Sequence, residues 1–204
     1  MKYKFLTALF LFAVALTLLS DLSYVHSVIK IPIRIATLLI MLAPIYFVMK
    51  KEVSFKEILF QQQFTRKTFY EVAIISLGLI VFASIIRFFS YDNSFITFGN
   101  SLHYKEYLPL YVTFGYFVEV LLQDTIFILI YVGLSKFVTT QQKSFWSVAI
   151  VFGFAHIYFG FFTALLTFLT AIVFLLIYQR YQNLLALGFI HYSAGVASIA
   201  FGWT

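Results

Sequence analysis

The chain has 204 residues, of which 62% are hydrophobic, 21% aromatic and only 11% charged, and its formal net charge is +6. A soluble domain holds about 45–50% apolar and about 25% charged residues, so this chain has too little polar surface for a water-soluble globule. It contains no cysteine, which excludes disulfides, thiol nucleophiles and thiolate metal sites. In so apolar a chain the positive charge is interpreted as that of loops that meet anionic lipid, and not as a nucleic-acid-binding surface.

Repeated apolar runs of 18 or more residues predict an all-α fold, a polytopic membrane helical bundle with about seven transmembrane helices. No small-residue cleavage site follows the first run, so we expect it to be retained as a helix. The predicted spans, in chain order, are Phe5–Leu19, Ile31–Met49, Glu71–Phe89, Tyr107–Phe137, Ser144–Phe159, Phe162–Tyr178 and Leu184–Phe201.

The most polar stretch is Lys50–Tyr70, which holds five basic residues and the sequence FQQQF and is expected to form a short amphipathic helix at the membrane surface. Ten of the 14 Lys and Arg residues fall on one side if the N-terminus is placed in the cytoplasm. The positive-inside rule therefore predicts a multi-pass protein of the cell membrane with a cytoplasmic N-terminus. Residues 1–106 form an N-terminal half of spans and basic loop, and residues 107–204 a half that carries the polar motifs.

The run Tyr107–Phe137 is strongly apolar yet carries Glu119, Gln123 and Asp124. A charge at mid-bilayer costs about 2.5–3.5 kcal/mol on the insertion scale, so a buried acid indicates function. Two later apolar runs carry His156 and His191. At about 1.5 Å rise per residue, Gln123 and both histidines lie at similar depth, which predicts one buried polar site. The alternative is that each group only holds neighbouring helices together by hydrogen bonds.

Three motifs carry a resemblance to a known family. The stretch FGFAH ends at His156, RYQNLLALGFIHYSAG contains His191, and QDTIFILI begins at Gln123. Together, over about Tyr116–Ser198, they resemble the CPBP family of CAAX-protease and bacteriocin-processing membrane proteins, also called Abi. The resemblance implies that a glutamate and the histidine matching His156 activate a water. It also implies that the histidine matching His191 and an asparagine stabilise the oxyanion.

The first motif of that family, Glu-Glu-x-x-x-Arg, is degenerate in this chain. Gln123 and Asp124 stand at the two glutamates, Ile128 replaces the arginine, and Gly195 replaces the usual asparagine of the third motif. A glutamine amide cannot serve as a general base, because it is neutral and not usefully basic. An alternative frame that starts at Glu119 lacks both the second glutamate and the arginine.

Three functional hypotheses follow. The first is a weakly or non-catalytic member that acts by binding a peptide or membrane-protein partner, for example in bacteriocin self-immunity or beside a cell-envelope enzyme. The second is an active intramembrane endopeptidase in which Asp124 or Glu119 serves as base with His156. The third is a proton-coupled transporter. The bilayer is the expected environment in each case.

No cofactor is predicted. Zinc held by His156, His191 and Glu119 lacks the support of a local His-Glu-x-x-His motif. His26 and His103 fall in predicted loops and are interpreted as surface residues.

Overall fold

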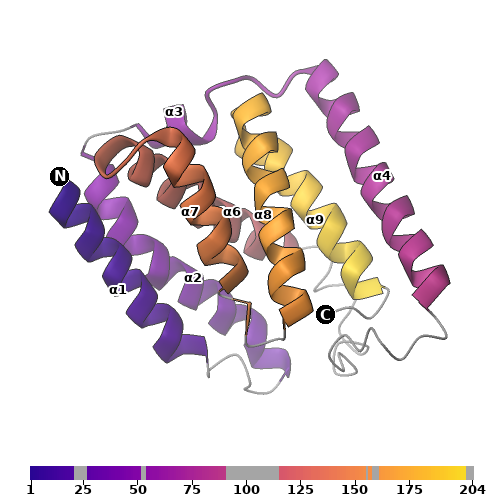
Figure 1. The fold of residues 1–204 in the computed structure, drawn as a ribbon, viewed down its shortest axis with the longest axis horizontal. Helices are drawn as coiled ribbons and strands as arrows, with labels where there is room; N and C mark the ends of the chain where they lie inside the picture. The colour runs from indigo at the N-terminus through magenta and orange to yellow at the C-terminus, as the bar shows by residue number, and fades with distance from the viewer. Residues whose placement is uncertain (21–26, 52–53, 91–114, 155, 158–160, 201–204) are drawn as a thin grey trace.

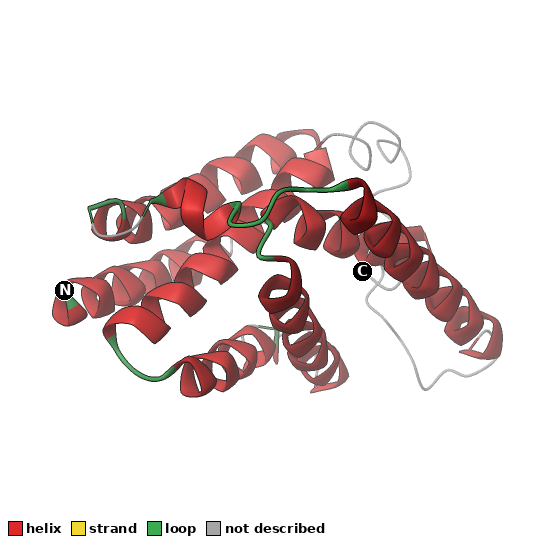
Figure 2. Ribbon diagram, turned by 90° about the horizontal axis from the view of Figure 1, so that it is seen from above, coloured by secondary structure: helices red, strands yellow, loops and turns green. Residues whose placement is uncertain are grey.

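The computed structural model describes residues 1–20, 27–51, 54–90, 115–154, 156–157 and 161–200. This part of the chain forms eight helices and no strand, which confirms the all-α prediction (Figures 1 and 2). The helices are α1 (Lys2–Ser20), α2 (Ser27–Met49), α3 (Phe55–Leu59), α4 (Arg66–Ser90), α6 (Tyr116–Phe137), α7 (Gln141–Phe154), α8 (Phe161–Tyr181) and α9 (Leu184–Ala200).

Helix α6 lies at the centre of the bundle and contacts α1, α2, α3, α7 and α9. In Figure 1 the α1–α2 pair lies to one side of it, and α4 lies at the opposite edge beside α9. The position of α6 follows from its sequence, since from Tyr116 to Phe137 it is apolar on nearly every face. A helix that is apolar all round is stable only where other helices or lipid cover it.

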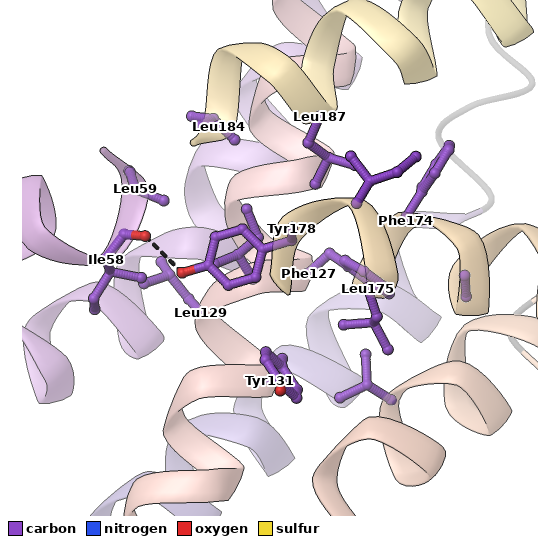
Figure 3. Packing of buried hydrophobic residues seen from close by; sticks show 14 of the residues in the cluster. Ile58, Leu59, Phe127, Leu129, Tyr131, Phe174, Leu175, Tyr178, Leu184 and Leu187 are labelled. Carbon is purple, nitrogen blue, oxygen red and sulfur yellow. Dashed lines mark hydrogen bonds between the residues drawn. The ribbon is translucent and has the colours of Figure 1, made fainter. Parts of the chain in front are cut away.

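The buried core is built from aliphatic and aromatic side chains of all these helices, with Ile128, Leu129, Leu175 and Leu187 fully buried. Within it the Tyr178 hydroxyl donates a hydrogen bond of 2.6 Å to the Ile58 carbonyl, which links α8 to α3 (Figure 3). A buried tyrosine hydroxyl needs such a partner, because an unpaired polar group in this environment costs free energy.

Two described helices are long and apolar enough to cross a membrane: Tyr116–Phe137, and Ala164–Tyr181 within α8. The described parts of α2 and α9 add two shorter apolar helices, Ile35–Met49 and Leu184–Ala197. The bundle of seven spans goes beyond this observation and stays a prediction.

One predicted element is wrong in its bounds. The helix expected over Ser144–Phe159 ends at Phe154, so that His156 lies two residues beyond α7. The short helix expected within Lys50–Tyr70 is present as the five residues of α3, while its place at a membrane surface stays a prediction, and α4 begins at Arg66. The residues between α3 and α4 leave the helix because they pair with a distant part of the chain, the α8–α9 turn.

That pairing fixes how α9 enters the bundle. The backbone N–H of Gln61 donates to the Gln182 carbonyl at 3.0 Å, and the Asn183 amide donates to the Gln62 carbonyl at 2.8 Å. Gln182 adopts a left-handed backbone with φ of 44°. The Asn183 carboxamide oxygen accepts from the N–H groups of Leu185 (2.9 Å) and Ala186 (3.2 Å), and so caps the N-terminus of α9.

Candidate functional site

The polar residues of α6 divide into two groups. Glu119 and Asp124 are both buried, each with 1% of its surface exposed, whereas Gln123 is half-buried. The Gln123 amide donates a hydrogen bond of 3.1 Å to Glu119 Oε1. These two residues are four apart and share a face of the helix, as the sequence predicts. Asp124 points about 100° away from Gln123 and meets a different helix.

Asp124 pairs with His191 of α9. Its Oδ1 lies 2.8 Å from His191 Nδ1, a hydrogen-bond distance, with the two side chains only 2% and 15% exposed. The Phe174 ring of α8 packs on the imidazole, with ring centroids 4.5 Å apart. In this geometry the carboxylate fixes the orientation of the imidazole through Nδ1. The other ring nitrogen, Nε2, points away from Asp124.

The second carboxyl oxygen of Asp124, Oδ2, is buried and has no hydrogen-bond partner among the described residues. Its surroundings are the close contact between α6 and α9 at Gly188. A Cβ added at Gly188 would lie 3.8 Å from Oδ2 and 2.5 Å from the Leu121 side chain. Buried polar atoms are nearly always hydrogen-bonded, so this oxygen is the exceptional feature of the site.

His156 lies just beyond the end of α7. Its Nδ1–H donates to the Phe152 carbonyl at 2.8 Å, and its ring lies 5.1 Å from that of Phe152. Phe152 in turn packs on Phe127 of α6, with centroids 5.1 Å apart. These contacts anchor His156 to the last turn of α7, which packs on α6.

Tyr116, which the sequence did not single out, also lies beside the site. The Tyr116 side chain fills the space in which a side chain at Gly195 would lie, so that any Cβ there would overlap the phenol. Tyr116 also packs on Tyr192, with ring centroids 5.9 Å apart. Gly195 is one helical turn beyond His191 on α9. The signal that could have found Tyr116 is its spacing of three residues from Glu119, which puts both on one face of α6.

The remaining candidates contribute less. His26 and His103 lie outside the described residues. Within the described part of the chain, no three His, Asp or Glu side chains come together in a way that could hold a metal ion.

The five residues singled out from the sequence thus form two contacts, Glu119 with Gln123 and Asp124 with His191, while His156 bonds to the Phe152 carbonyl of its own segment. The first is a hydrogen bond along one helix. The second joins two helices and contains a titratable pair that could hold or move a proton. No family model, curated protein or solved structure matches the chain.

Proposed function

We propose that this chain is a multi-pass membrane protein of the CPBP type, with a cytoplasmic N-terminus, that binds a peptide or membrane-protein partner and cleaves it weakly or not at all. Self-immunity to a bacteriocin and partnership with a cell-envelope enzyme are roles of this kind. The proposal combines the sequence resemblance with two features of the structure: its apolar surface and the division of polar residues on α6.

The apolar surface supports the membrane part of the proposal. On α4 the side chains of Ile74, Leu77, Val81, Phe82 and Ile85 are 49–69% exposed. On α8 a second exposed series consists of Leu165, Leu166, Leu169, Val173 and Leu176. Soluble monomers rarely expose large contiguous apolar patches, whereas lipid tails cover such surfaces without cost.

The single observation that carries the functional part is that Asp124 is bound to His191 while Gln123 is bound to Glu119. The resemblance implies a carboxylate at position 123 working with His156. That position holds an amide, which accepts no proton at useful pH. The neighbouring carboxylate makes its hydrogen bond with the other histidine. A polar site of this kind can hold hydrogen-bonding groups of a partner yet lacks the expected base.

The test is a cleavage assay with purified protein in liposomes, using a pool of apolar peptides read by mass spectrometry. We expect no new peptide termini above those formed by an Asp124→Asn/His156→Ala variant. Robust turnover that disappears in His156→Ala would overturn the proposal.

Binding is tested in cells with a photo-reactive residue in place of Tyr192, which lies beside the site. A matched variant carries the same group at Leu77, on the exposed face of α4. A crosslinked peptide or protein specific to the Tyr192 position is expected. Equal crosslinking at both positions would contradict binding at the site.

A second candidate, an active intramembrane endopeptidase, is favoured by the 2.8 Å contact between Asp124 and His191. An oriented imidazole could take a proton from water, as in hydrolases that use an Asp–His pair. In that case Asp124→Asn lowers turnover by about 10²–10⁴, the usual contribution of acid–base catalysis, while Gln123→Ala has little effect. The same assay separates the two candidates.

A further inference from the structure

The Asp124–His191 pair is enclosed by close contacts between α6 and α9 on both sides. Gly188, His191 and Gly195 lie on one face of α9, three and four residues apart. The Leu121 side chain occupies the space beside Gly188, and Tyr116 the space beside Gly195. Each contact is about one helical turn from His191. Asp124 is consequently held in a tightly packed place, with 1% of its surface exposed.

In such a place an ionised carboxylate whose Oδ2 accepts no hydrogen bond is strongly unfavourable. A metal ion does not resolve this, because the described residues hold no group of three ligating side chains. A proton on Oδ2 does, because it removes the charge and leaves only a neutral hydroxyl in apolar surroundings. Oδ1 stays free to accept from His191 Nδ1–H.

We infer that the Asp124–His191 pair is a proton-binding site whose proton resides on Asp124 Oδ2. In this state the pair is neutral: the carboxyl group is a carboxylic acid, and the imidazole carries its single proton on Nδ1. Release of the proton to water leaves one negative charge between α6 and α9. The inference goes beyond the proposed function and rests on the orphan oxygen and its packing.

The other titratable groups around the pair are few. His156 lies beyond the end of α7, and Glu119 lies on α6 itself. On α9, Tyr192 directly follows His191, and Tyr116 at the start of α6 fills the space beside Gly195, one turn from His191. The described core side chains of α2 and α3 that adjoin α6 are apolar: Met41, Ile45, Met49, Ile58 and Leu59. No described cation among the core residues compensates an ionised Asp124 other than His191 itself.

Infrared spectroscopy of the whole protein in liposomes decides the protonation state. At neutral pH we expect the carbonyl band of a carboxylic acid, which should be lost in Asp124→Asn and kept in Glu119→Gln. Asn is chosen at position 124 because its amide keeps the acceptor for His191. A second measurement uses an apolar carbodiimide. It reacts with a carboxylic acid by forming a bond between a carboxyl oxygen and the carbodiimide carbon, while the acid proton moves to nitrogen.

We expect that reagent to modify Asp124, and a water-soluble carbodiimide to modify exposed Glu57 instead. Modification should fall by about tenfold for each pH unit above the midpoint of proton release. Absence of the acid band in the wild-type minus Asp124→Asn difference overturns the inference, whether or not the carbodiimide reaches the site. Its failure is distinct from that of the proposed function: an ionised Asp124 in a protein that cleaves nothing refutes only the proton site.

Discussion

Two polar contacts between helices, one in the middle of the bundle and one at its end, differ in what surrounds them. In the middle, Asp124 and His191 are buried, and Asp124 Oδ2 has no hydrogen-bond partner in the part of the chain that the structure describes. At the end, Glu71 of α4 accepts hydrogen bonds from Tyr181 (2.8 Å) and Arg180 (3.1 Å) of α8, and Arg180 is largely exposed to the surroundings. The end contact has enough donors for its carboxylate and is explained by holding helices together. The buried contact lacks a donor for Asp124 Oδ2 among the described residues and is not explained in this way, which is why it is the candidate site.

The largest effect is expected from breaking the buried pair. His191→Ala leaves the buried Asp124 without its hydrogen-bond partner and opens a cavity where the imidazole was, and together these should cost about 3–5 kcal/mol of unfolding free energy. Replacing both residues by leucine should recover most of that loss, because packed apolar side chains replace buried polar pairs well. Denaturation in detergent micelles measures both. A single His191→Ala variant as stable as wild type would mean that the pair does not form.

The next effect concerns the packing beside the pair. Gly195→Asn forces a side chain into the space of Tyr116 and should destabilise by about 1–3 kcal/mol, the usual cost of overpacking. Tyr116→Ala in the same chain makes room and should restore part of the stability. Gly78→Asn is the matched control, since among the described residues nothing beyond the adjacent backbone of α4 lies within 4 Å of a Cβ at Gly78. Equal effects at the two glycines would contradict the close approach of α6 to α9.

A smaller effect is expected at the turn that leads into α9. Asn183→Ala removes the helix cap and the hydrogen bond to the Gln62 carbonyl, and should cost about 1–2 kcal/mol. Asn183→Ser keeps a capping oxygen but loses the donor to Gln62, so it should fall between Ala and wild type. Hydrogen exchange of the Gln61 amide reports the pairing directly. Unchanged exchange in Asn183→Ala would show that the cap alone matters.

The smallest effect is expected at the exposed end. Arg180→Gln removes an ion pair with Glu71 that is accessible to salt, so the wild type and the variant should become alike as ionic strength rises. If added salt leaves the effect of His191→Ala unchanged, the two contacts differ in their exposure as described. If the stabilities of both variants respond to salt in the same way, this difference between the buried and the exposed contact is contradicted.

The sequence predicted the helical class, because this class depends on local composition. The shared face of Glu119 and Gln123 follows from their spacing of four residues and the period of the helix. It did not predict the end of α7 at Phe154, since the apolar run continues past it and hydropathy carries no mark of the turn. The pairing of Gln61 and Gln62 with the α8–α9 turn joins segments about 120 residues apart. Such contacts leave no local signal.

The same holds within the candidate site. The five candidate residues were found because they are polar residues within apolar runs. That Asp124 would pair with His191 could not be found in this way, because the rotation of α9 about its axis is set by packing. Gly188 and Gly195 leave the space that Leu121 and Tyr116 occupy in this packing. The sequence drew attention to Gly195 only as the replacement of the family's asparagine, and it carried no sign of the close packing at either glycine.

Asn183 caps α9 and also donates a hydrogen bond to the Gln62 carbonyl. The direction in which each later side chain of α9 points therefore depends on how many residues separate it from Asn183. A helix turns by about 100° per residue. Inserting one alanine between Asn183 and His191 would therefore carry the histidine a quarter-turn or more away from Asp124 while leaving the length of α9 almost unchanged. Inserting four residues, slightly more than one turn, would bring a side chain back to nearly the same direction about 6 Å further along the helix. The hydrogen bond between Asn183 and the Gln62 carbonyl at the end of the bundle thus helps to determine which way His191 faces in the site.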